Sequence, residues 1–143
     1  MDEKQLIEKL HRVEALFEGA GTDGEREAAA NALGRLRRRL EDVQESDPVI
    51  EYRFTLADMW SRRLFVALLR RYGIRPYRYY RQRHTTVMAK VPKRFVDETL
   101  WPEYTELNKV LSSYLDETTE RVISRGIHED SSEAEVMKAL PGA

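Results

Sequence analysis

The residue types that most often carry out chemistry in proteins do not show a catalytic or metal-binding spacing in this sequence. The chain has no cysteine, which excludes disulfides, thiolate nucleophiles and thiolate zinc sites. Its histidines, His11, His84 and His128, include no pair four residues apart and no H-E-x-x-H pattern. No serine lies in a G-x-S-x-G turn, and the glycines of residues 19–24 follow a helical pattern, whereas a phosphate loop follows a strand. We therefore expect a protein that is not an enzyme and that has no metal site and no cofactor.

Positive charge is concentrated in the middle of the chain, although the formal net charge is only −1. Residues 50–95 hold 12 basic and 2 acidic side chains, whereas residues 1–49 hold 8 and 12, and residues 96–143 hold 4 and 11. Arginine outnumbers lysine 10 to 2 in the central block, and tyrosines are interleaved with it. Arginine binds phosphate oxygens bidentately, and tyrosine rings stack on unpaired bases. This pattern favours a surface for single-stranded nucleic acid or RNA.

We accordingly predict a nucleic-acid-associated or regulatory function for the basic block of residues 50–95. The candidate nucleic-acid-binding residues are Arg62, Arg63, Arg70, Arg71, Arg75, Arg78, Tyr79, Tyr80, Arg81, Arg83, His84, Lys90, Lys93 and Arg94. Tyr77 is interleaved with them.

Two other interpretations of these features stay open. The tyrosines are β-formers and would then face the covering helices, while the arginines would pair with the 11 carboxylates of residues 96–143. A protein-binding or oligomeric adaptor is the alternative function. It would use the N-terminal helical hairpin, where Ala28, Ala29 and Ala30 permit close helix approach.

Residues 1–48 are expected to form that hairpin. Leu6, Leu10, Val13 and Phe17 recur at helical spacing, and Thr22 with Glu25, three residues later, is a capping-box pattern that opens a second helix over about 23–44.

An α/β module is expected over residues 49–126. Alternation predicts strands at 50–55, 74–81 and 85–91, and a helix lies between the first two, from Asp58 to Gly73. A last long helix should begin near Lys93, restart at Pro102 and end at Gly126. The fold class is thus α+β: a helical hairpin followed by a β-α-β-β-α module, with a small, mainly antiparallel sheet covered by helices.

Pairing and burial follow from these patterns. Strand 85–91 should pair antiparallel with 74–81, which carries Pro76 and is the better edge strand. The residues expected in the core are Trp60, Leu64, Leu68, Val87, Ala89 and Val91. Residues 127–143 should form an acidic, mobile tail beside one compact domain.

The motif T-x-G-E-x-x-A-A, formed here by Thr22, Gly24, Glu25, Ala28 and Ala29, resembles that of an uncharacterised bacterial and phage helical-hairpin family. In that family an α/β module often follows, and W-S-R-R-L at 60–64 and R-Y-G at 71–73 are similar to its first helix. The resemblance implies architecture without an activity. The sequence has no apolar run of about 18 residues and no apolar leader in its first ten, so we expect a cytoplasmic protein without membrane contact.

Overall fold

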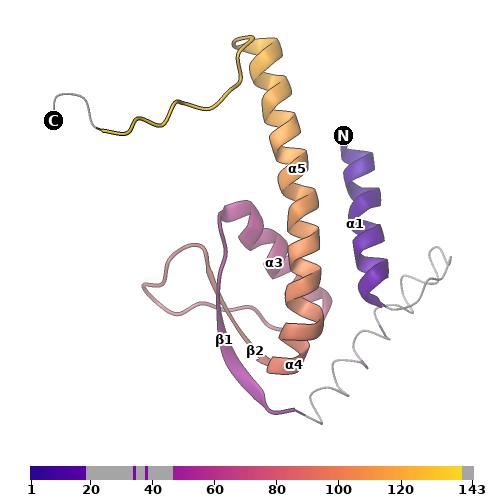
Figure 1. Cartoon of the computed structure of the whole chain (residues 1–143). Helices are drawn as coiled ribbons and strands as arrows, with labels where there is room; N and C mark the ends of the chain where they lie inside the picture. The colour runs from indigo at the N-terminus through magenta and orange to yellow at the C-terminus, as the bar shows by residue number, and fades with distance from the viewer. Residues whose placement is uncertain (19–33, 35–37, 39–46, 140–143) are drawn as a thin grey trace.

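The computed structural model of the chain describes residues 1–18, 34, 38 and 47–139 (Figure 1). Its elements are helix α1 (Glu3–Glu18), strand β1 (Val49–Thr55), helix α3 (Met59–Arg71), strand β2 (Thr86–Pro92), the short helix α4 (Lys93–Phe95), the π-helix η1 (Val96–Leu100) and helix α5 (Trp101–Gly126). The predicted α+β class is confirmed. The second helix predicted at 23–44 lies outside the described residues, apart from positions 34 and 38.

The sheet consists of β1 and β2, which pair antiparallel from Val49 opposite Pro92 to Thr55 opposite Thr86. The predicted strand at 74–81 is wrong, and of its predicted antiparallel pairing with 85–91 only a single antiparallel bridge is present, between Tyr77 and Met88. Proline at 76 offers no backbone N–H for a longer ladder. Beyond Tyr77 the chain turns away, and Arg81 takes a left-handed φ of 70°. The module order is therefore β-α-β-α, not β-α-β-β-α.

The helices cover one face of this sheet, and the core lies between the helices and the sheet. Val87, Ala89 and Val91 of β2 are buried on this face, as predicted, and they belong to one cluster with Phe65 and Leu69 of α3. An aromatic group extends the cluster, since the Phe65 ring lies 4.5 Å from that of Phe54, 6.0 Å from Trp101 and 5.1 Å from Tyr104. The core thus joins β1, α3 and the start of α5.

Helix α3 follows its predicted limits but not its whole predicted buried face. Asp58 caps its first turn by accepting a hydrogen bond from the Ser61 amide at 2.8 Å, and Gly73 ends it with φ of 74°. Leu68 is buried and Leu64 partly so, but Trp60 is 58% exposed, which contradicts the prediction. Each four-residue step rotates a side chain by about 40° around the helix axis, so Trp60 lies about 80° from Leu68.

The C-terminal helical stretch confirms the predicted break near Pro102, because α4 and η1 precede α5, which has this proline in its first turn. Figure 1 shows the far half of α5 extending beyond the sheet, with α1 beside it. The Met1 ammonium group pairs with Glu117 at 2.9 Å there. Residues 127–139 hold no helix or strand. Within the described ranges, no helix has the length and apolar character needed to cross a bilayer.

Candidate functional site

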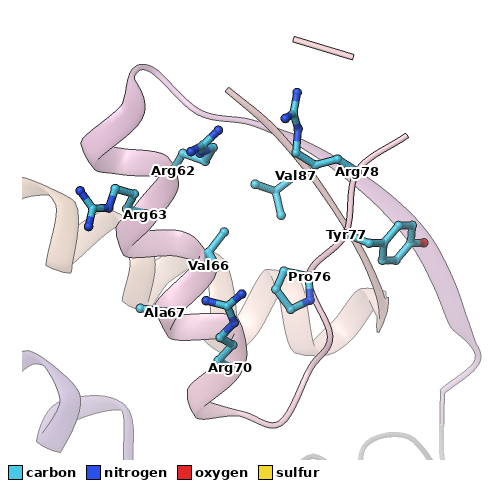
Figure 2. A pocket seen from close by; sticks show the side chains of 9 residues that line it. All are labelled: Arg62, Arg63, Val66, Ala67, Arg70, Pro76, Tyr77, Arg78 and Val87. Carbon is cyan, nitrogen blue, oxygen red and sulfur yellow. The ribbon is translucent and has the colours of Figure 1, made fainter. Parts of the chain in front are cut away.

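An open pocket of about 710 Å³ lies between α3 and the segment 76–78. Four arginines line it, Arg62, Arg63 and Arg70 from α3 and Arg78 from the facing segment (Figure 2). Its apolar lining comes from Val66, Ala67, Pro76 and Val87, and Tyr77 contributes as well. The structure therefore brings together four of the predicted arginines, which lie as far as 16 positions apart in the sequence.

Helix geometry explains which arginines of α3 meet the pocket. Arg62, Val66 and Arg70 are spaced by four residues, so they follow one face of the helix, toward segment 76–78 (Figure 2). Arg63 lies one position further round, and although it belongs to the lining, its guanidinium points away from segment 76–78 in Figure 2. Arg71 belongs to another face and pairs with Glu14 of α1 at 3.0 Å. Arg71 therefore links α3 to α1 and does not line the pocket.

Two of the pocket arginines also hold the loop that follows Tyr77. The Nη1 of Arg62 donates to the His84 carbonyl oxygen at 2.7 Å. The Nη2 of Arg78 donates to the carbonyl oxygens of Gln82, at 2.9 Å, and Arg83. These bonds fix the loop against the pocket and the positions of both guanidinium groups.

Arg63 and Arg70 are different, because within the described part of the chain they have neither a hydrogen-bond acceptor nor an ion-pair partner. Both side chains are exposed. No aspartate or glutamate is among the described residues that line the pocket. Chemically, guanidinium N–H donors that face no carboxylate among the described lining residues provide a setting for an anion.

Of the tyrosines at 77, 79 and 80, the first two bind Glu51 and the third does not. This role of Glu51 was not predicted from the sequence. Tyr77 and Tyr79 both donate their hydroxyl protons to Oε2 of Glu51 on β1. These hydrogen bonds hold the pKa of Glu51 below its ordinary value, and the same carboxylate raises the pKa of each tyrosine. Glu51 is one of only two acidic residues in the basic block of residues 50–95, and this rarity is the sequence signal that could have marked it as a partner for the tyrosines. Tyr77 and Tyr79 therefore anchor the segment to the sheet, and they do not face the covering helices.

Tyr80 is the tyrosine that remains available for stacking, with 91% of its surface exposed. The Arg81 guanidinium carbon lies 5.7 Å from the centre of its ring. Tyr79 is 51% exposed, but its ring also contacts Tyr77 edge-on at 5.7 Å. Arg75 lies 6.0 Å from the Tyr77 ring. Of the predicted aromatic pair, Tyr80 keeps an open face, and Tyr79 is partly used by the fold.

The other predicted cations lie outside the pocket lining. Arg94 pairs with Glu98 at 3.2 Å, which fits the internal-pairing interpretation for this residue, and Lys90 lies opposite Glu51 in the sheet register. Exposed side chains without a place in the pocket are Arg83, His84 and Lys93. The predicted patch is therefore not one continuous site: it has a defined pocket and a surrounding charged surface.

In the described part of the chain, no three histidine, aspartate or glutamate side chains gather as a metal site would require. In the tail, His128 accepts a hydrogen bond from the Asp130 amide at 2.9 Å, within a local turn. Comparison of the chain with protein-family models, with characterised proteins and with solved structures finds no match. The residues of the T-x-G-E-x-x-A-A motif lie outside the described ranges, so the resemblance to the helical-hairpin family stays a prediction.

Proposed function

We propose that this protein binds single-stranded nucleic acid, DNA or RNA, without acting on it chemically, and that the arginine pocket is the centre of the binding surface. The observation that carries the proposal is that four arginines, Arg62, Arg63, Arg70 and Arg78, line one pocket whose described lining contains no carboxylate. Phosphate oxygens are the acceptors for which guanidinium groups are best suited, and single strands bring both phosphates and unpaired bases.

The surroundings of the pocket support a single strand as the ligand. Tyr80 lies two residues beyond Arg78 and exposes most of its ring, so a base could stack there while the backbone contacts the pocket. Cations outside the lining, such as Arg75, Arg83 and Lys93, would add contacts that are independent of sequence. We expect binding with little base preference, because the described donors suit phosphate and the ring suits any base.

The test is a titration of fluorescent oligothymidylate and oligouridylate with the full chain, followed by anisotropy over a range of salt concentrations. About five phosphate contacts give a log–log slope of affinity against salt near −3.5, at roughly −0.7 per contact for single strands. Absence of binding at low salt, where electrostatic attraction is strongest, would end the proposal.

The adaptor function is the second candidate, favoured by two exposed apolar side chains on opposite faces of α1, Leu16 (76%) and Ile7 (45%). In that case the N-terminal region would bind a protein partner or a second copy. Sedimentation velocity distinguishes the candidates: a dimer that is lost in a Leu16→Ser, Ile7→Ser variant, together with no oligonucleotide binding, would favour the adaptor.

A further inference from the structure

Strand β1 has one paired edge and one open edge. The Leu56 amide, just past the strand, donates to the Thr85 carbonyl oxygen at 3.0 Å, so the residues two, four and six positions earlier also direct their backbone groups toward β2. The alternate residues, whose N–H and C=O groups therefore point to the opposite edge, are Val49, Glu51, Arg53 and Thr55. In the described part of the chain no strand pairs with that edge, because the sheet consists of β1 and β2 and the bridge from Tyr77 is made to β2.

This open edge lacks two of the features that usually prevent pairing with another chain. Strand β1 contains no proline, and its register with β2 is continuous, without a bulge. Val49 and Ile50, at its start, are 46% and 43% exposed. Its charged side chains, Glu51 and Arg53, lie on the face away from the core, so they restrict which strand can pair there.

Strand β1 reads V-I-E-Y-R-F-T, which is complementary to itself when two copies run antiparallel. Full overlap of the two strands places Tyr52 opposite its own copy and Glu51 opposite the partner's Arg53. Each copy then gains an opposite-charge pair, and the outward backbone groups of both strands face one another. A shift of two residues would place either Glu51 or Arg53 opposite its own copy, and it would also shorten the overlap.

The two charged side chains are available for this pairing. In the described part of the chain, Arg53 has neither a hydrogen-bond acceptor nor an ion-pair partner, and it is exposed. Glu51 accepts hydrogen bonds from Tyr77 and Tyr79 on Oε2, and no described donor reaches Oε1. The tyrosines therefore hold the carboxylate in place, and its second oxygen can accept from a guanidinium group of another chain.

We propose that β1 pairs antiparallel with the β1 strand of a second copy of this chain, in the register that places Glu51 opposite the partner's Arg53. The two sheets then become one sheet of four strands with a two-fold axis at Tyr52. This inference goes beyond the proposed nucleic-acid binding and does not depend on it. No residue of β1 is among the described lining of the arginine pocket, so the dimer carries two such pockets, both open.

Sedimentation equilibrium of the full chain, over a wide range of protein concentration, tests the association. We expect a monomer–dimer equilibrium for the wild-type protein. Arg53→Glu places two carboxylates opposite each other at both charge pairs, so it should weaken the dimer about tenfold or more. The matched control, Arg125→Glu, makes the same charge change at an exposed position of α5 and should leave the dimer unchanged. Circular dichroism confirms that each variant is folded.

Cysteine cross-linking tests the register. The chain has no cysteine of its own, so a single introduced cysteine reports on one position. Tyr52→Cys should form a covalent dimer with oxidised glutathione, because residues directly opposite in an antiparallel pair have Cα atoms about 4.5–5.5 Å apart, within disulfide range. Ile50→Cys lies on the same face but should not cross-link, because the two copies of residue 50 would be roughly 13 Å apart along the strands.

A monomer at every concentration would overturn the inference, and so would a dimer that Arg53→Glu leaves as stable as in the wild-type protein. Cross-linking at residue 50 as efficient as at residue 52 would refute the register. A dimer that is lost in the Leu16→Ser, Ile7→Ser variant but kept in Arg53→Glu would assign the association to α1. If Tyr52→Cys fails to fold, the comparison of Arg53→Glu with Arg125→Glu still decides. Oligonucleotide binding is measured separately, so its failure leaves this inference standing.

Discussion

Replacing Arg63 and Arg70 by glutamine removes two cationic groups from the pocket and leaves shorter, uncharged polar side chains. Neither arginine holds a described part of the fold, in contrast to Arg62 and Arg78, whose replacement would also release the loop carbonyls. If both arginines neutralise a phosphate, the log–log slope of affinity against salt should fall by about 1.4, at roughly 0.7 per contact.

The expected loss of affinity with salt differs clearly between the wild-type protein and the Arg63→Gln, Arg70→Gln variant. From a slope near −3.5, the wild-type protein should lose about a hundredfold in affinity between 50 and 200 mM salt. With a slope near −2.1, the variant should lose only about twentyfold over the same range. Anisotropy with a labelled oligothymidylate measures both, and circular dichroism confirms that the variant is folded.

The control is the Arg125→Gln, Lys138→Gln variant, which removes the same number of charges from exposed positions in the acidic third of the chain. Its slope should stay at the wild-type value. Equal slopes for the pocket variant and the control would refute the reasoning, because affinity would then depend on overall charge and not on the pocket.

Three further predictions concern the fold around the site. Phe65, with no exposed surface, packs against three aromatic rings, so Phe65→Ala should lower the free energy of unfolding by about 3–5 kcal/mol, measured by urea denaturation. Gly73→Ala should cost about 1–2 kcal/mol, because alanine is strained at φ of 74° although its Cβ has space, whereas Gly126→Ala should not incur this strain. Because the folded pKa of Glu51 is lowered, its stabilising contribution is present above the ordinary glutamate pKa of 4.5 and is lost as the pH falls through the folded pKa. The melting-temperature difference between wild type and Glu51→Gln should therefore shrink in that acidic range, and a constant difference would contradict the assignment.

Local signals in the sequence predict most of the secondary structure described for residues 47–139. Alternation located β1 and β2, and Asp58, Gly73, Pro102 and Gly126 lie at or beside the helix limits because they act through their own backbone geometry or capping. Each of these signals depends on a few neighbouring residues.

Strand pairing could not be predicted in the same way. Segment 74–81 has strand-forming tyrosines next to a turn, which indicates a hairpin with 85–91. The actual partner of β2 is β1, whose paired residues lie 31 to 43 positions earlier and offer a full seven-residue register. Burial of Phe54 opposite Val87 accompanies this pairing, and a hairpin partner carrying Pro76 offers fewer backbone donors.

The candidate site shows the same division between local and long-range information. Charge counting located the arginines, but it could not tell which of them converge. That depends on the packing of α3 against segment 76–78 and on Glu51, a residue of β1 that anchors Tyr77 and Tyr79. The sequence pattern described one continuous patch, and tertiary contacts separate it into pocket, anchors and exposed surface.

Adjacent arginines on α3 test whether the arginines of the basic block serve the fold, here with an acid of α1 and not with the predicted carboxylates of residues 96–143. Arg71 pairs with Glu14 at 3.0 Å and joins α3 to α1, with 30% and 22% of the two side chains exposed. Arg71→Gln should therefore destabilise the fold by about 1–2 kcal/mol, because solvent partly screens this half-exposed pair. For a chain of this length that lowers the melting temperature by about 3–6 °C.

Arg70 is one position away but lines the pocket, where the described residues offer it no carboxylate. Arg70→Gln relieves repulsion from neighbouring arginines and breaks no described contact, so the melting temperature should stay unchanged or rise slightly. Differential scanning calorimetry of the two single variants measures both effects at low salt. A loss of stability in Arg70→Gln as large as that in Arg71→Gln would mean that the pocket arginines serve the fold. The argument for an anion site would then lose its basis, because it requires positive charge that the fold itself does not use.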